Sequence, residues 1–249
     1  MLTPEDIYLH AVINRHRAPD NDPSPHRLRR RLEPLLRSWA GNNLESITVS
    51  GSHAKGTALR GGDVDLFLSL SPATPGPLAA IHASLAAHFL HHTPQPRNVS
   101  LRIRFDNTNV DLVPGRRRED STNHTLWQLR TDTWIQTNIA EQIRYVRSSR
   151  FLNEILALKI WRRRHALRFP SFYLELSVIH ALNHQITKSL NHQIERVLDF
   201  LSSDFPRTRL PDPANSNNLL SDLLSEEDKH RIAGVAQMSL QASSWLEIL

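Results

Sequence analysis

The chain has 249 residues, with 30 lysines and arginines against 25 aspartates and glutamates, and it contains no cysteine. A chain without cysteine has no disulfide scaffold, zinc–cysteine site, iron–sulfur cluster or thiol nucleophile. No apolar run approaches the roughly 20 residues of a membrane span, and the first residues lack the pattern of a signal peptide. We therefore expect a cytoplasmic protein without a membrane partner, and the formal net charge of +5 favours a polyanionic partner.

The first forty residues predict two helices. Thr3 has the character of a helix cap and is followed by Pro4 at the first helical turn. Ser24 and Pro25 begin a second helix, whose leucines recur at helical spacing as far as Gly41. After this point the spacing changes to the alternation that is typical of strands.

The following segment combines strands with turns and a helix. Alternating apolar residues predict four strands, at residues 46–50, 63–68, 99–105 and 110–113. Between them we expect a turn, a loop and a helix, at residues 51–62, 72–77 and 78–90. Pro114 and Gly115 are expected to end the last strand, and residues 115–135 are too polar to assign.

The second half of the chain predicts helices. Helical spacing covers residues 138–168 with a break near Ser148, then 169–184, 189–201 and 225–249, and residues 206–218 are predicted to form a loop. The fold class is therefore predicted to be α+β. A mixed sheet with helices is expected over residues 1–135, and an all-helical lobe over residues 136–249.

Two carboxylates are predicted to share one face of a strand. Asp63 and Asp65 are two residues apart, so their side chains project to the same side, while Val64 and Leu66 point into the core. Such carboxylates repel each other unless a cation lies between them, and Mg²⁺ prefers hard oxygen ligands. The competing interpretation, a solvated strand edge, applies to most isolated Asp-x-Asp pairs.

The neighbouring motifs favour a phosphate site over that interpretation. Gly51-Ser52 directly follows a predicted strand, where backbone N–H groups and a hydroxyl can meet a phosphate. Asp111 lies on another apolar strand that could pair beside the first two carboxylates. Three carboxylates are what two-metal phosphoryl transfer needs, so we expect Asp63, Asp65 and Asp111 to be both metal ligands and catalytic residues, with two Mg²⁺ ions and Mn²⁺ as an alternative.

These motifs resemble those of the DNA polymerase β-like nucleotidyltransferase superfamily. The segments Ala54-Lys55-Gly56-Thr57 and Leu59-Arg60-Gly61 are similar to archaeal-type CCA-adding enzymes. Val110-Asp111-Leu112-Val113-Pro114 is similar to the third-carboxylate motif of those enzymes, of oligoadenylate synthases and of bacterial CD-NTases. The resemblance continues through residues 156–161 and 169–176, and through Pro211-Asp212-Pro213 followed by Asn217-Asn218.

The resemblance implies a set of nucleotide-binding residues: Gly51, Ser52, Lys55, Thr57, Arg60, Lys159, Ser171 and Tyr173. Lys159 lies in an apolar stretch, where an ammonium group is costly unless it meets an anion such as a triphosphate; the alternative is a lysine that snorkels from a helix face. Ser171 could bind phosphate at a helix start or be a plain N-cap. Tyr173 could stack on a base or pack in the core, and Glu175 is expected to hold local structure.

The predicted reaction is the template-independent, metal-dependent transfer of a nucleoside monophosphate from an NTP to a 3′-hydroxyl, which releases pyrophosphate. We expect the acceptor to be an RNA 3′ end, bound by two arginine blocks whose alternative is a solvated surface: Arg116, Arg117 and Arg118, and Arg162, Arg163 and Arg164. A maker of cyclic or short linear oligonucleotides, as in the CD-NTases and oligoadenylate synthases, is the alternative, although the chain looks short for either group. An inactive nucleotide- or RNA-binding relative is a third alternative. The sequence does not indicate an oligomeric state or a preferred base.

Overall fold

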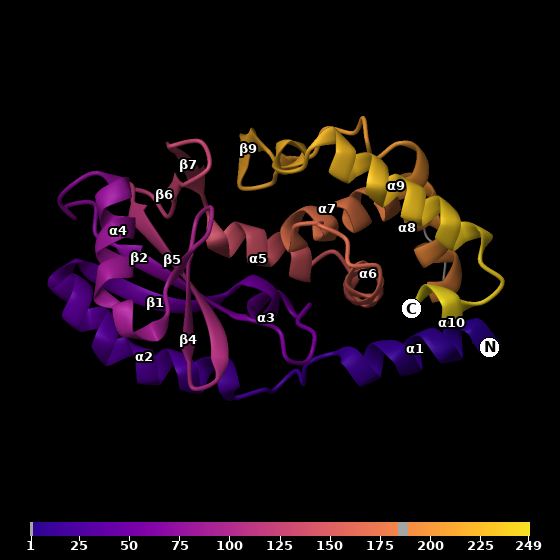
Figure 1. Ribbon diagram of the computed structural model, residues 1–249, viewed down its shortest axis with the longest axis horizontal. Coiled ribbons are helices and arrows are strands. Elements are labelled where there is room, and N and C mark those ends of the chain that lie inside the picture. Colours follow the sequence, from indigo (N-terminus) through magenta and orange to yellow (C-terminus); the bar gives the residue numbers. More distant parts are fainter. Residues whose placement is uncertain (1, 184–188) are drawn as a thin grey trace. The chain divides into compact units, whose positions relative to one another are not determined.

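The computed structural model describes residues 2–183 and 189–249 (Figure 1). The chain forms two compact units. The sheet unit consists of residues 19–56 and 61–144, and the helical unit of residues 1–18, 57–60 and 145–249. The chain therefore passes between the units at residues 18/19, 56/57, 60/61 and 144/145.

The sheet unit contains a mixed seven-stranded sheet with the order β1-β2-β5-β4-β3, extended by β6 beside β5 and β7 beside β6. The strands are β1 (Leu44–Ser50), β2 (Val64–Leu70), β3 (Gln95–Pro96), β4 (Leu101–Phe105), β5 (Thr108–Arg117), β6 (His124–Gln128) and β7 (Thr133–Thr137). Strands β2 and β5 run parallel, and the other neighbouring pairs are antiparallel. This parallel pair lies at the centre of the unit and carries the carboxylates predicted above.

Helices pack against this sheet and complete its core. They are α2 (Ser24–Ala40), α3 (Gly51–Lys55) and α4 (Leu78–His88), with short 3-10 turns at Gly41–Asn43 and Leu90–His92. Leucines of α2 and α4 pack with the apolar residues of β2, β4 and β5 in one buried cluster. Helix α5 (Ile139–Arg147) carries the chain from this unit into the helical unit.

Strand β5 continues through Pro114 and Gly115, so the prediction that they end it was wrong. Pro114 lies between Leu112, where pairing with β4 ends, and Arg116, where pairing with β6 begins. On the other side of the strand Pro114 is opposite Leu68 of β2, and the missing N–H of proline is tolerated where one side of a strand has no partner. A Cβ on Gly115 would lie 2.7 Å from the Phe67 ring, so glycine allows that ring to pack against the strand.

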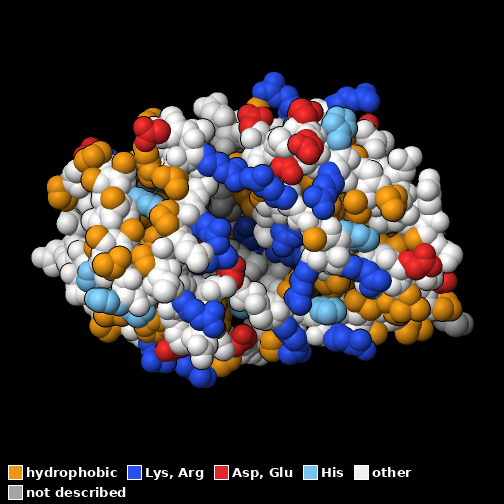
Figure 2. Space-filling model, in the orientation of Figure 1, with side chains coloured by type: hydrophobic (Ala, Val, Ile, Leu, Met, Phe, Trp, Pro, Cys, Tyr) orange, Lys and Arg blue, Asp and Glu red, His pale blue; other side chains and the backbone are white. Residues whose placement is uncertain are grey.

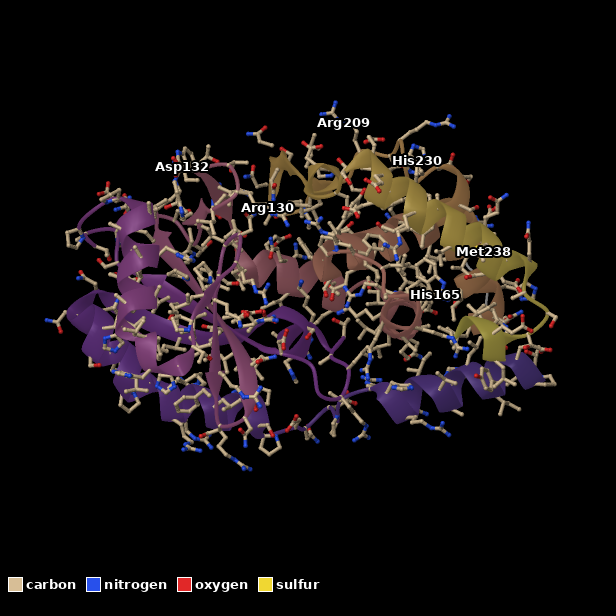
Figure 3. The ribbon with its side chains drawn as sticks, in the orientation of Figure 1. Arg130, Asp132, His165, Arg209, His230 and Met238 are labelled. Carbon is tan, nitrogen blue, oxygen red and sulfur yellow. The ribbon has the colours of Figure 1, made fainter. Side chains whose placement is uncertain are left out.

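The polar segment that could not be assigned forms the hairpin of β6 and β7. Its register brings Trp127 opposite Trp134, and aromatic cross-strand pairs of this kind stabilise hairpins. The turn between the strands includes Arg130 and Asp132, which Figure 3 labels. Most side chains of this hairpin are partly or fully exposed. Its sequence is therefore polar and lacks the apolar alternation by which the other strands were predicted.

The helical unit contains α1 (Pro4–His16), α6 (Leu152–Arg164), α7 (Ser171–Leu182), α8 (Leu190–Ser203), α9 (Glu226–Gln241) and α10 (Trp245–Ile248). The helical segment predicted at 138–168 forms two helices, α5 and α6, with the expected break near Ser148 between them. The predicted loop at 206–218 contains a small hairpin of β8 (Pro211–Asp212) and β9 (Asn215–Leu219). A 3-10 turn at Leu220–Leu223 follows it. The predicted end of a helix at residue 184 lies outside the described residues. Figure 3 labels His230 and Met238 on α9, and Met238 is exposed.

Helix α1 packs with the helical unit rather than with the sheet that follows it in sequence. Leu9 and Ile13 are buried in the same apolar cluster as the residues of α6 and α7. Oδ1 of Asp6 accepts a hydrogen bond from the backbone N–H of Asn191 at 2.8 Å and another from the Ser189 hydroxyl at 3.1 Å. Both chain ends lie in this unit, where α10 is close to α1 (Figure 1). Among the described residues, no helix is both long and apolar enough to cross a membrane.

Candidate active site

The centre of the sheet unit brings two aspartates side by side. In the parallel register of β2 and β5, Asp65 pairs with Asp111. The neighbours Val64 and Leu66 are buried in the core, so alternation directs Asp65 to the other face. Asp63 immediately precedes β2. The three carboxylates therefore lie towards the N-terminal ends of the two central strands.

Gly51 brings the backbone close to this carboxylate group. Its φ angle is +57°, and a Cβ at this position would overlap the Asp65 carboxylate and lie 2.8 Å from the Asp65 Cβ. Only glycine combines that conformation with that proximity. The predicted turn at 51–62 contains, at this point, the short helix α3 (Gly51–Lys55), so Gly51 and Ser52 form its first turn beside Asp65.

A guanidinium group lies among the carboxylates. Arg102 on β4 is opposite Asp111 in the register of β4 and β5. Its Nε donates to Oδ1 of Asp111 at 3.0 Å, and its Nη2 donates to Oδ2 of the same residue at 2.7 Å. The same Nη2 also donates to Oδ2 of Asp63. These contacts raise the pKa of Arg102, chiefly through the hydrogen bonds to Asp111.

The donor set suits a divalent cation of the magnesium type. Carboxylate oxygens are the ligands such ions prefer, and the position of the Arg102 guanidinium shows that Asp63 and Asp111 together accept a positive charge. With Arg102 in this position, the described residues contain no group of three histidine, aspartate or glutamate side chains spaced to hold an ion. The residue types fit a metal site, and Arg102 lies where part of that site would be.

The helical unit buries a lysine–glutamate pair. Nζ of Lys159 on α6 lies 2.6 Å from Oε1 of Glu175 on α7, and the two side chains are 3% and 1% exposed. Thr57 joins the pair, because its hydroxyl donates to Oε1 of Glu175 at 2.7 Å and accepts from Nζ of Lys159 at 2.9 Å. Nζ also donates to the Thr57 carbonyl at 3.0 Å. The anion that Lys159 needs in its apolar surroundings is therefore Glu175, which holds local structure as expected.

Other residues predicted to contact the nucleotide are hydrogen-bonded within the chain or buried. Arg60 donates to the Arg15 carbonyl at 3.0 Å. Lys55 on α3 is buried. Tyr173 is fully buried, and its ring packs edge-on to Phe169 at 5.4 Å between centroids. Its ring is thus a core side chain in this structure, and burial raises the pKa of its hydroxyl.

Ser171 and Arg60 are the exposed members of the predicted group, and Ser171 lies at a helix start. It begins α7, and its hydroxyl accepts a hydrogen bond from Nη1 of Arg162 at 2.9 Å. The same Nη1 donates to the Phe169 carbonyl at 2.7 Å. Partial burial lowers the pKa of Arg162, and Glu175 opposes that shift. A hydroxyl, a guanidinium and a helix start therefore lie together at the surface of the helical unit.

The arginines predicted to bind RNA mostly contact their own chain. In the first block, Arg117 forms a double hydrogen bond with Glu45, at 2.8 and 2.9 Å. Arg116 donates to the Gly76 carbonyl at 2.8 Å, and Arg118 donates to Gln136. In the second block, Arg164 donates to the carbonyls of Leu246 and Leu249, and Arg163 lines a cavity of about 390 Å³ beside α1. Figure 2 shows many lysine and arginine side chains, in blue, on the face of the molecule that is in view.

Sequence reasoning missed Arg102. The alternation of residues 99–105 identified a strand, which places Arg102 on the face opposite Leu101 and Ile103. Its position beside Asp111 depends on how β4 pairs with β5, and a register of that kind is set by contacts along the whole hairpin.

Comparison with known proteins identifies the fold. A family model described as a nucleotidyltransferase domain matches residues 30–160. CdnC of E. coli MS115-1, solved with ATP, is 21% identical, has a TM-score of 0.76, and aligns over 94% of this chain and 90% of that one. The CD-NTase CdnG of Bradyrhizobium diazoefficiens, solved with GTP, is 14% identical with a TM-score of 0.73, over 98% and 95% of the chains.

A third similar structure belongs to another kind of enzyme. The Cid1 poly(U) polymerase, as an H336N mutant bound to MgATP, is 13% identical with a TM-score of 0.64, over 95% of this chain and 93% of that one. No curated protein matches the chain. These findings confirm the predicted α+β fold, with its mixed sheet and its helical second half. Because the family model covers more than half of the sequence, the protein belongs to the nucleotidyltransferase domain family, within the predicted DNA polymerase β-like superfamily.

Proposed function

We propose that this nucleotidyltransferase moves a nucleoside monophosphate from an NTP to a hydroxyl of a second nucleotide, and that Asp63, Asp65 and Asp111 hold two Mg²⁺ ions, or Mn²⁺ in their place. The pairing of Asp65 with Asp111 on adjacent parallel strands, beside the backbone of Gly51, is the observation that carries this proposal. Nucleotidyltransferases of this superfamily use divalent metal ions, and the donor set described above suits them.

The chemistry requires an acceptor hydroxyl to lose its proton and attack the α-phosphorus. Metal ions, when bound, would lower the pKa of that hydroxyl and neutralise charge on the triphosphate. Asp111 orients the hydroxyl and accepts its proton, and its side chain is 13% exposed. A bond forms between the acceptor oxygen and the α-phosphorus, and the bond to the oxygen bridging the α- and β-phosphates breaks. Pyrophosphate leaves with that oxygen.

We propose two groups of phosphate contacts, one in each unit. Gly51 and Ser52 begin α3 in the sheet unit, and we propose that their backbone N–H groups and the Ser52 hydroxyl contact the phosphates. Ser171 and Arg162 lie at the surface of the helical unit, and a guanidinium suits phosphate oxygens. Lys159 and Thr57 are hydrogen-bonded to Glu175 within the helical unit, so we assign them a structural role in that unit rather than a contact with the triphosphate.

A nucleotide acceptor is supported better than an RNA end. Five of the six arginines predicted to track RNA donate hydrogen bonds within their own unit: Arg116, Arg117, Arg118, Arg162 and Arg164. The chain also spans 90% and 95% of the CdnC and CdnG chains. The apparent shortness that counted against an oligonucleotide-signal synthase therefore no longer does so. The proposed product is a short linear or cyclic oligonucleotide.

Extension of an RNA 3′ end is the second candidate. The likeness to the Cid1 poly(U) polymerase favours it, since the two chains align over nearly their whole lengths. The exposed members of the two arginine blocks would make the RNA contacts: Arg118, Arg163 and Arg164.

One assay separates these functions. Each α-³²P-labelled NTP, alone and in pairs, is incubated with Mg²⁺ or Mn²⁺, with and without RNA, and the products are resolved on thin-layer plates and denaturing gels. Small phosphatase-resistant products without RNA support the nucleotide acceptor. Labelled RNA with no small product would overturn that acceptor and support the second candidate. If no labelled product forms under any of these conditions, with or without RNA, the protein is an inactive relative and the proposed function is wrong.

A further inference from the structure

The strongest unexplained feature of the site is the contact between Arg102 and two of the proposed metal ligands. Arg102 forms a two-pronged pair with Asp111 and a third hydrogen bond to Asp63. The three side chains are 23%, 13% and 36% exposed. Pairs with this geometry and partial burial are stronger than ordinary surface ion pairs.

This contact and a metal ion make competing demands on the same oxygen atoms. Both carboxylate oxygens of Asp111 accept N–H groups from Arg102, at 3.0 and 2.7 Å. A magnesium ion takes its ligand oxygens at about 2.0–2.1 Å in near-octahedral geometry. A guanidinium and a divalent ion placed that close together would also repel each other strongly. Both cannot occupy the site in full.

We propose that Arg102 is an internal counter-ion that holds Asp63 and Asp111 together until divalent metal displaces it. The arginine stabilises the metal-free carboxylates against mutual repulsion, and it weakens the binding of free metal ions. Metal that arrives with the negative charge of an NTP has an advantage, because the triphosphate offsets the repulsion from the guanidinium. The inference rests on the proposed function, since it takes the three aspartates as the metal site.

The same strand offers a matched control. Arg104 is two residues from Arg102 and therefore projects from the same face of β4. It is opposite Asn109 in the register instead of an aspartate, and it is exposed. Replacing Arg104 removes the same charge about 7 Å along the strand without removing the contacts to Asp63 and Asp111. A general electrostatic effect and a specific contact can thus be told apart.

Binding of Mn²⁺ alone tests the proposal, with free Mn²⁺ measured by electron paramagnetic resonance on the whole chain. We expect Arg102→Gln to bind Mn²⁺ about tenfold more tightly than the wild type or better, since losing one charge-assisted hydrogen bond already corresponds to such a factor. Arg104→Gln should change the affinity less than about threefold. Arg102→Lys keeps the charge without the two-pronged geometry and should fall between, which provides a second reading if Arg102→Gln folds poorly by circular dichroism.

The outcomes distinguish the inference from the function on which it rests. Asp63→Asn and Asp111→Asn should abolish the tight Mn²⁺ binding of Arg102→Gln. If these aspartates are needed for Mn²⁺ binding but neither Arg102 variant binds it more tightly than the wild type, the counter-ion role is wrong and the metal site stands. Equal tightening by Arg104→Gln would also contradict a specific role for Arg102. If no variant binds Mn²⁺ with or without ATP, the proposed function fails as well.

Discussion

Lys159 and Glu175 form a buried ion pair inside the helical unit, with 2.6 Å between Nζ and Oε1. Thr57 completes the group through both its hydroxyl and its carbonyl. Thr57 follows Gly56, the residue at which the chain leaves the sheet unit. The pair therefore anchors the segment 57–60 to α6 and α7. This segment follows α3, the short helix that begins with Gly51 and Ser52.

Breaking this ion pair should destabilise the protein. Removing one partner of a buried pair leaves an uncompensated charge, which costs about 3–5 kcal/mol, so Lys159→Met should lower the free energy of unfolding by roughly that amount. Urea denaturation followed by circular dichroism measures it. The double variant Lys159→Met/Glu175→Leu should be less destabilised than Lys159→Met alone. A single variant within about 1 kcal/mol of the wild type would show that the pair does not anchor this segment.

Gly51→Ala should abolish activity. The added methyl group would overlap the Asp65 carboxylate, and the φ angle of +57° is unfavourable for alanine. Gly41 is the control, because its φ angle is +55° and an added Cβ would have nothing within 4 Å. Gly41→Ala should lose about 1–2 kcal/mol of stability and keep its turnover per folded molecule. Equal turnover of the two alanine variants would argue against a role for the close contact between the Gly51 backbone and the Asp65 carboxylate.

The stability of the sheet unit should fall as the pH drops below about 6.5. Burial lowers the pKa of His124 below its ordinary value, and its Nε2 is 2.8 Å from the Ser69 hydroxyl. As the pH falls, His124 is protonated in the unfolded chain before it is protonated in the folded protein. Neutral His124 therefore makes its full contribution to the free energy of unfolding above the pKa of the unfolded state, and this contribution is lost as the pH falls towards the pKa of the folded state. Thermal unfolding between pH 5 and 8, in wild type and His124→Gln, measures this; the variant should show a flatter dependence. The same slope in both would rule out His124 as its source.

Asp6 should stabilise the helical unit through its contact with Asn191, which is 185 residues away in the sequence. Its carboxylate accepts the Asn191 N–H at the start of α8 and acts as a cap supplied by α1. Asp6→Ala should cost about 1–2 kcal/mol, as the loss of a helix cap does. Glu5→Ala, an exposed acidic neighbour in the same helical turn, is the matched control and should change stability by less than about 0.5 kcal/mol. Equal effects in urea denaturation would argue against the capping role.

The sequence predicted the parts of the fold that have a strong local signal. Thr3 and Ser225 cap their helices as their neighbours indicate, and the alternation of apolar residues located β1, β2 and β4. The hairpin of β6 and β7 was missed because its exposed polar side chains have no hydrophobic period. The course of β5 through Pro114 depends on where its neighbours stop pairing, and that information is not local.

The candidate site was predictable to a similar extent. The sequence predicted Asp63, Asp65, Asp111 and Gly51 as site residues, and the sheet register adds the pairing of Asp65 with Asp111. The partner of Lys159 is 16 residues away on the next helix, so its burial could be inferred from the apolar stretch but the identity of its anion could not. Arg102 reaches the carboxylates only through the pairing of β4 with β5.

The most direct test of the account is pyrophosphate release by aspartate variants of the whole chain. Asp65→Asn and Asp111→Asn should each reduce release from γ-³²P-labelled NTP by about 100- to 1,000-fold, since removing a group that stabilises charge at a reacting centre costs about that factor. Circular dichroism and urea unfolding should show that both variants are folded. Asp132→Asn, an exposed position in the β6–β7 turn with a φ angle of +53° that asparagine tolerates, should release pyrophosphate at the wild-type rate. Turnover retained by a folded Asp65→Asn/Asp111→Asn double variant would contradict the assignment of these carboxylates as the catalytic centre.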